Sequence, residues 1–156
     1  MNSDGSRDGE AARERALRLL ARREHTRREL TGKLGQRGFD GEVIRHTLDD
    51  LEAEGLLDER RFAEGFVRSR LDRGQGPLRI RRELSHRGVD GAVAEEVLGE
   101  AGVDWRARAR EARARRFGSA VAADRREVAR QARFLEQRGF TPDQIRAALS
   151  GAWDDD

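Results

Sequence analysis

The amino-acid sequence predicts an all-α protein of three tandem three-helix repeats, about nine helices in all, arranged as an elongated and modular chain. Two observations lead to this prediction. A short string of residues recurs three times at nearly constant spacing, and each copy has the composition of a corner between two helices. Between these strings, apolar residues recur at helical spacing and follow residues that cap helices.

The repeated string consists of a leucine, two variable residues, Arg-Gly, an apolar residue and a short polar residue. It occurs at 34–40, 84–90 and 135–141, and another leucine follows fourteen residues after the first in each copy. The glycines are expected at helix ends, where positive φ has no steric cost for glycine; they are Gly38, Gly88 and Gly139. The polar residues that close the strings are N-cap candidates for the next helix; they are Asp40, Asp90 and Thr141.

Helix starts between the corners follow the same rules. Thr26 with Glu29, and Thr141 with Gln144, have the spacing of a capping box, while Pro77 stands at a first helical position. Asp58 precedes a further apolar-periodic segment. Together with the apolar spacing, these signals predict helices over 11–23, 27–37, 41–54, 59–73, 77–87, 91–101, 105–117, 124–138 and 142–151.

The chain of 156 residues is expected to divide at its repeats. The predicted parts are an acidic disordered N-terminal tail at 1–10, repeats at 11–57, 58–103 and 104–151, and an acidic C-terminal tail at 152–156. Only 35 residues are apolar side chains larger than alanine, too few for one deep core. Small units of this kind can stack on their neighbours, which gives one long face rather than one pocket.

Composition argues against several function classes. Cysteine is absent, which removes disulfides and thiol nucleophiles, and no apolar run approaches the roughly 18 residues of a membrane helix. The N-terminus has no apolar segment of a secretory signal, so a cytoplasmic location is expected. His25, His46 and His86 are isolated, and no phosphate-binding glycine loop is present. We therefore expect no enzyme activity, no metal and no cofactor.

The charge is distributed unevenly. Residues 11–150 hold 31 basic and 24 acidic residues, and the surplus lies in three blocks at 13–37, 68–87 and 105–150 with net charges of +6, +5 and +7. One basic block per repeat indicates a partner that carries negative charge. The alternative is a structural adaptor whose arginines only balance its own carboxylates.

A DNA-binding helix-turn-helix is a second alternative. The segment 27–54 has the right length, with 42–50 as the helix that would read DNA. That helix carries Glu42, Asp49 and Asp50, which phosphates would repel. Aromatic residues for base stacking are also few. Contact with phosphates through arginine fits the composition better than reading of base sequence.

Several motifs resemble the RecX family in order and spacing. They lie at 16–34, 55–63, 76–84 and 133–140, and the resemblance covers about residues 11–150. It implies a small regulator of the RecA recombinase, built of three tandem three-helix repeats, that binds the RecA–DNA filament along its groove. Such a regulator suppresses ATPase, strand-exchange and coprotease activities. Some members of the family also bind DNA themselves.

The resemblance supplies no catalytic motif, so the candidate contact residues are arginines of the three basic blocks. They are Arg22, Arg23, Arg27, Arg28, Arg68, Arg79, Arg81, Arg82, Arg108, Arg115, Arg116 and Arg130. The expected partner is the RecA nucleoprotein filament, with single- or double-stranded DNA as a further, sequence-independent ligand. We expect a monomer that does not enter membranes. An autonomous DNA-binding helix-turn-helix regulator remains the alternative function.

Overall fold

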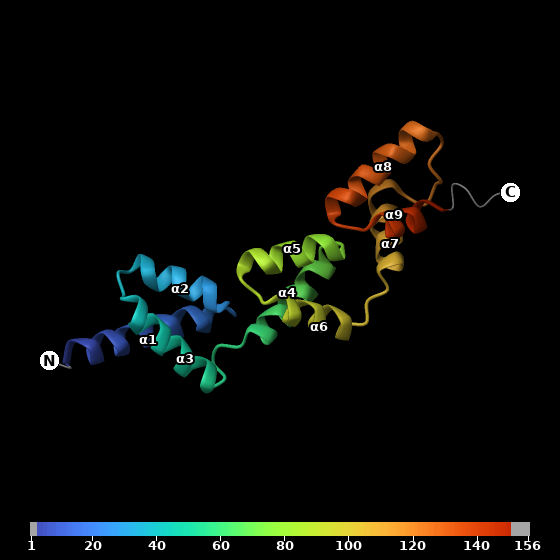
Figure 1. The fold of residues 1–156 in the computed structure, drawn as a ribbon. Helices are drawn as coiled ribbons and strands as arrows, with labels where there is room; N and C mark the ends of the chain where they lie inside the picture. Colours follow the sequence, from blue (N-terminus) through green and yellow to red (C-terminus); the bar gives the residue numbers. More distant parts are fainter. Residues whose placement is uncertain (1–2, 151–156) are drawn as a thin grey trace.

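The computed structural model describes residues 3–150, and within this range the chain forms nine α-helices and no strand, which confirms the all-α prediction. The helices make three units of three, α1–α3, α4–α6 and α7–α9, laid end to end in an elongated chain (Figure 1). Their bounds are α1 Ser3–Arg22, α2 Arg27–Gln36, α3 Gly41–Ala53, α4 Glu59–Asp72, α5 Pro77–Arg87, α6 Gly91–Glu100, α7 Trp105–Phe117, α8 Arg125–Arg138 and α9 Pro142–Leu149.

Each unit has a hydrophobic core of its own. Within a unit the first and third helices make the most extensive contacts, and the middle helix packs against the pair they form. The first leucine of each repeated string, Leu34, Leu84 or Leu135, is fully buried in the core of its unit. The repeat in the sequence is therefore a repeat of core positions, since the same residue anchors the middle helix each time.

The three corners have the conformation that the sequence predicts. Gly38, Gly88 and Gly139 have φ values of +87°, +95° and +96°. In each corner the apolar residue after the glycine donates its backbone N–H to the carbonyl of the string's leucine, at 3.0–3.3 Å, which closes a Schellman motif. The predicted caps also form: Asp40, Asp90 and Thr141 accept backbone N–H groups of the next helix.

The predicted disorder of residues 1–10 is wrong for the part that the structure describes. α1 begins at Ser3, and Gly5, Gly9 and Arg13 lie along a groove against Val43 and other residues of α3. The segment has no apolar periodicity, but it extends a helix already held by buried alanines and leucines, and acidic residues suit the first turns of a helix. The repeat boundaries at 11–57, 58–103 and 104–151 stay predictions, and the tail at 152–156 lies outside the described residues.

The middle helices α2, α5 and α8 follow one another along one side of the chain (Figure 1). The first turn of α2 meets the last turn of α5, where the Thr26 hydroxyl donates to the Arg87 carbonyl at 2.7 Å. The first turn of α5 likewise meets the last turn of α8, where the Gly76 N–H donates to the Arg138 carbonyl at 2.7 Å. We call these contacts the first and second junctions.

Two of the corner glycines also make the junctions possible. A Cβ atom on Gly88 would lie 2.6 Å from Cβ of Arg28, and one on Gly139 would lie 2.3 Å from Cβ of Arg79. A Cβ atom on Gly38 would meet nothing within 4 Å, because this corner lies at neither junction of the described units. Glycine is thus needed at the corners both for positive φ and, in two of them, for close approach of the neighbouring unit.

A candidate anion-binding surface on the middle helices

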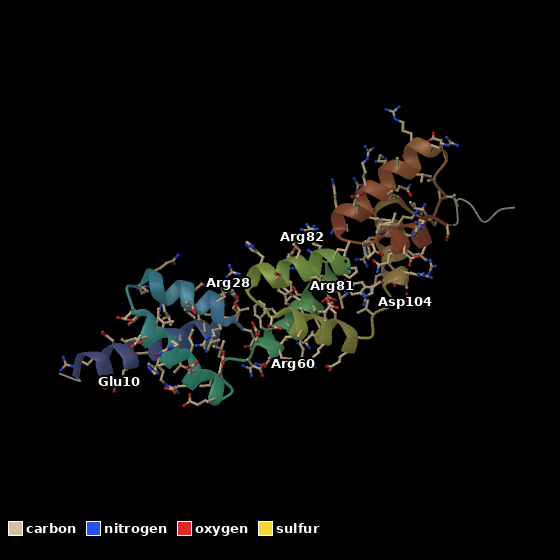
Figure 2. All side chains as sticks on the ribbon, in the orientation of Figure 1. Glu10, Arg28, Arg60, Arg81, Arg82 and Asp104 are labelled. Atoms are coloured by element: carbon tan, nitrogen blue, oxygen red, sulfur yellow. The ribbon has the colours of Figure 1, made fainter. Side chains whose placement is uncertain are left out.

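Several exposed arginines on the middle helices take part in no ion pair within residues 3–150. We call Arg28 of α2, Arg82 of α5, and Arg126 and Arg133 of α8 the arginine row. Arg28 and Arg82 are labelled on the side of the chain that the middle helices form (Figure 2). Their guanidinium groups are available to an external anion because no carboxylate of the described chain occupies them.

The neighbours of two members of the row are neutralised. Arg81 donates to Glu95 of α6 at 2.6 Å, and Arg27 pairs with Asp49 and Glu52 of α3 at 2.7 and 3.2 Å. Arg81 lies on the side of α5 nearer α6, whereas Arg82 extends outward (Figure 2). Of two adjacent arginines on one helix, the one that faces the acidic third helix of its unit is therefore paired, whereas the other remains available to an external anion.

A groove of about 600 Å³ lies beside the first junction, and we call it the first groove. Its floor is Phe66 of α4, and two guanidinium groups lie over this ring, that of Arg70 at 4.3 Å and that of Arg87 at 5.5 Å from the centroid. Arg23 at the end of α1 and Arg73 at the end of α4 complete the basic lining.

Carboxylates neutralise most of the first groove. Glu29 pairs with Arg23 at 2.9 Å and with Arg87 at 3.5 Å, and Glu83 pairs with Arg70 at 2.7 Å. Although burial opposes it, the hydrogen bonds from Arg23 and the Thr26 N–H, with the charges of both arginines, hold the pKa of Glu29 below its ordinary value. Glu29 therefore stays ionised and cancels the charge around it.

A smaller cavity of about 130 Å³ lies at the second junction, and we call it the second groove. It is built like the first: Arg138 of α8 and Arg116 of α7 lie over Phe134, with ring-centroid distances of 5.1 and 5.9 Å. Its basic lining consists of Arg73, Arg115, Arg116 and Arg138. Across the described chain, none of these four arginines has a carboxylate within ion-pair distance, so the second groove keeps its positive charge.

The structure divides the twelve arginines that the sequence singled out. Five pair with carboxylates, namely Arg23, Arg27, Arg79, Arg81 and Arg130. The other seven have no such partner in the described range; they are Arg22, Arg28, Arg68, Arg82, Arg108, Arg115 and Arg116. Arg68 lines a separate pocket with Glu64 and Glu100, so the twelve do not form one continuous surface. Their contact with a partner stays a prediction.

Sequence reasoning missed four arginines that line the grooves and two of the arginine row; they are Arg70, Arg73, Arg87, Arg138, Arg126 and Arg133. A signal for two of them was present, since Arg87 and Arg138 are the arginines of the repeated Arg-Gly string. The string predicts a helix corner, and its glycine explains that corner. The arginine before the glycine has a separate role, because in both junctions it lies over a phenylalanine of its own unit.

The described residues hold no group of three histidine, aspartate or glutamate side chains placed to bind a metal ion. His25 is buried, with Nδ1 3.0 Å from the Arg23 carbonyl and Nε2 3.2 Å from Nζ of Lys33. No helix in residues 3–150 combines the length and the apolar character required to cross a membrane. The arginine row and the second groove are therefore the candidate binding features of the described chain.

Three helical units placed end to end define a modular helical repeat protein, with arginines that are unpaired within residues 3–150 on its middle helices and at its second junction. Models of the first, second and third three-helix domains of RecX match residues 12–51, 58–98 and 104–149. The chain belongs to the RecX family of regulatory proteins.

Relatives and a solved structure agree over nearly the whole length. Regulatory protein RecX of Halorhodospira halophila is 60% identical over 154 residues, which cover 99% of this chain and 96% of that protein. Regulatory protein RecX of Pseudomonas savastanoi pv. phaseolicola is 50% identical, with 94% of each chain covered. The crystal structure of RecX from Lactobacillus salivarius has the same fold, with a TM-score of 0.80 at 24% identity over 94% of this chain and 97% of that one.

Proposed function

We propose that this chain is a non-enzymatic regulator that binds RecA–DNA filaments as a monomer in the cytoplasm. By binding, it inhibits the recombinase, ATPase and coprotease activities and so modulates recombination and DNA repair. Membership of a family of regulatory proteins supports the regulatory role. The observation that carries the binding mode is the row of unneutralised arginines along the end-to-end middle helices.

The length of this surface suits a polymeric partner. The 10, 11 and 14 residues of α2, α5 and α8, placed end to end, extend over about 50 Å at the rise of an α-helix. An extended surface can contact several phosphates or acidic side chains of a filament at once. Each phosphate contact releases condensed counterions, so the binding gains strength from many weak sites.

The helix-turn-helix alternative is disfavoured by the position of α3. Its Ile44, Leu48 and Leu51 are buried in the first core, so this face of the helix is not available to DNA. Its exposed residues include Asp49 and Glu52, which pair with Arg27. A helix with an acidic outer face is repelled by the phosphates on both sides of a DNA groove.

Two matched double variants test the proposed binding surface. Arg28→Gln with Arg82→Gln removes two charges of the arginine row, whereas Arg27→Gln with Arg81→Gln removes two charges already paired within the chain. Both variants lose the same net charge from the same two helices. We expect the first to lower co-sedimentation with RecA filaments on single-stranded DNA and to relieve inhibition of DNA-dependent ATP hydrolysis. The second should stay close to the wild type.

Two results would contradict the proposal. Equal inhibition by the two double variants, with unchanged circular dichroism, would show that the row is only a solvated surface. Failure of the wild-type protein to co-sediment with the filament would remove the proposed function itself.

A further inference from the structure

We infer that the second groove is a pocket for one phosphate group of a nucleic-acid backbone, and that the bound phosphate joins the second and third units. The inference rests on the proposed function only for the source of the phosphate. The pocket itself is lined by Arg73, Arg115, Arg116 and Arg138, and their arrangement does not depend on a partner protein.

The charge of the pocket is the first reason. In the first groove Arg23 and Arg87 meet Glu29, and Arg70 meets Glu83. In the second groove four guanidinium groups line one small cavity without a carboxylate partner. Like charges gathered in this way repel, so an anion placed among them lowers the free energy of the folded chain.

The helix ends explain why the cluster is tolerated when empty. Arg115 and Arg116 lie in the last turn of α7, Arg138 lies in the last turn of α8, and Arg73 is the C-cap of α4. The carbonyl end of a helix stabilises a nearby cation. This interaction offsets part of the repulsion among the four arginines, and the hydrogen bond of Arg138 to the Arg73 carbonyl at 3.0 Å positions one of them.

The aromatic side chain in the lining bears on the ligand. The groove of about 130 Å³ has room for one phosphate group. Phe134, the aromatic residue of the pocket, lies beneath Arg116 and Arg138 and makes an edge-to-face contact with Phe117, so its ring is not presented for base stacking. The pocket therefore fits backbone contact, which carries no sequence information.

A phosphate suits this lining better than a carboxylate does. Its oxygens point in different directions, so guanidinium groups from separate helices can each donate to it, whereas a planar carboxylate is satisfied by one or two forks in its own plane. We therefore assign the pocket to a phosphodiester rather than to an acidic side chain of a protein.

The position of the pocket links binding to the junction. Arg73 belongs to the second unit and the other three arginines to the third, and Arg138 already donates to the Arg73 carbonyl at 3.0 Å. An anion held by both units stabilises their contact, since a ligand that binds only the assembled arrangement favours that arrangement. The bound phosphate thus holds the third unit in one orientation relative to the second, and it also contributes to the affinity of the protein for the nucleic-acid strand.

The test uses the full chain without recombinase. The pocket variant is Arg115→Gln with Arg116→Gln, which leaves the backbone hydrogen bonds of the junction intact. The control is Arg125→Gln with Arg146→Gln, two exposed arginines of the same unit outside both grooves. Thermal unfolding is measured in chloride and in inorganic phosphate at matched ionic strength. Binding to a short oligothymidylate and to a poly-glutamate of equal charge is measured by calorimetry.

We expect phosphate to raise the melting temperature of the wild type and the control, but not that of the pocket variant. In chloride the pocket variant loses the repulsion among the arginines, but also the contact of Arg116 over Phe134 and two cations at the end of α7. The effect of phosphate is therefore measured for each variant against its own melting temperature in chloride. Affinity for oligothymidylate should fall about tenfold in the pocket variant, the loss of one strong charged contact.

Two results would overturn the inference: no rise in melting temperature with phosphate, or an equal rise in the pocket variant. Poly-glutamate bound as tightly, with the same dependence on Arg115 and Arg116, would overturn the assignment to a phosphodiester. Failure of the proposed function gives a different pattern, because phosphate and oligothymidylate would then bind as expected while the wild type does not co-sediment with RecA filaments.

Discussion

The two junctions join equivalent parts of the chain by different means. At the first, the Thr26 hydroxyl makes the hydrogen bond to the Arg87 carbonyl, and Glu29 neutralises the arginines beside it. At the second, the backbone N–H groups of Gly76 and Leu78 donate to the last carbonyl of α8 and to that of its C-cap Gly139, at 2.7 and 2.9 Å. A Cβ atom on Gly76 would lie 2.5 Å from the backbone of Gly139, so this contact excludes any side chain.

The two junctions share their packing contacts but differ in how their arginines are neutralised. Both junctions keep the arginine that lies over a phenylalanine and the glycine that permits close approach. Only the first supplies its own carboxylates. The first junction therefore combines the Thr26 hydrogen bond with ion pairs to Glu29, whereas the second combines backbone hydrogen bonds with that of Arg138 and leaves its arginines for a ligand.

The largest expected effect concerns the corner glycines. Gly139→Ala puts a side chain at positive φ and against Arg79, and it should lower the free energy of unfolding by about 3 kcal/mol. Gly38→Ala has the same backbone strain but open space around Cβ, so it should cost about 1 kcal/mol. Urea titration of both variants measures the difference. Equal losses would show that the junction contributes nothing at Gly139.

A smaller effect should make the first junction resemble the second. Glu29→Gln keeps the oxygen that accepts the Thr26 N–H, but it removes the negative charge between Arg23 and Arg87. Stability should fall by about 1–2 kcal/mol, the value of a charged hydrogen bond. Affinity for oligothymidylate should rise, because the first groove gains positive charge. An unchanged affinity for oligothymidylate would mean that the Glu29 carboxylate does not prevent the first groove from binding the strand.

Acid should weaken the first junction more than the second. Burial lowers the pKa of His25, and its neighbours Arg23 and Lys33 add to the shift despite the hydrogen bond to the Arg23 carbonyl and the charge of Glu29. The folded chain therefore prefers neutral His25, and stability falls as the pH drops below its ordinary pKa of 6.5. Glu29, whose pKa is lowered, loses its contribution at still lower pH.

Hydrogen exchange locates this effect. Between neutral pH and about pH 5.5, protection of amides in the first turn of α2, corrected for the intrinsic rate, should fall relative to those in the first turn of α5. His25→Gln removes the titrating group and should abolish the difference. Equal loss of protection at both junctions, or a difference that survives in His25→Gln, would show that His25 does not control the first junction.

The sequence predicts what depends on neighbouring residues. The corners at Gly38, Gly88 and Gly139, and the caps at Thr26 and Thr141, follow from local backbone chemistry, and the structure has them where expected. The start of α1 at Ser3 depends on packing against α3, so it could not be read from the periodicity of residues 1–10.

Ion pairs between different helices could not be predicted from the sequence either. Arg81 and Arg82 are adjacent and chemically identical, and only the position of Glu95 on another helix separates a paired arginine from an available one. The sequence shows where basic residues are concentrated along the chain. It does not show that Arg73 and Arg138 line one groove, because that depends on how three helices are arranged in space. Local rules give the units, and the site arises where units meet.

The most direct test of the account is the salt dependence of binding to oligothymidylate. Each phosphate contact with a single strand contributes about 0.7 to the slope of log affinity against log salt concentration. We predict that Arg116→Gln in the second groove lowers the slope by about this amount, while Arg23→Gln in the first groove leaves it unchanged. Equal slopes for the two variants, or a larger change for Arg23→Gln, would contradict the claim that the second junction holds the phosphate.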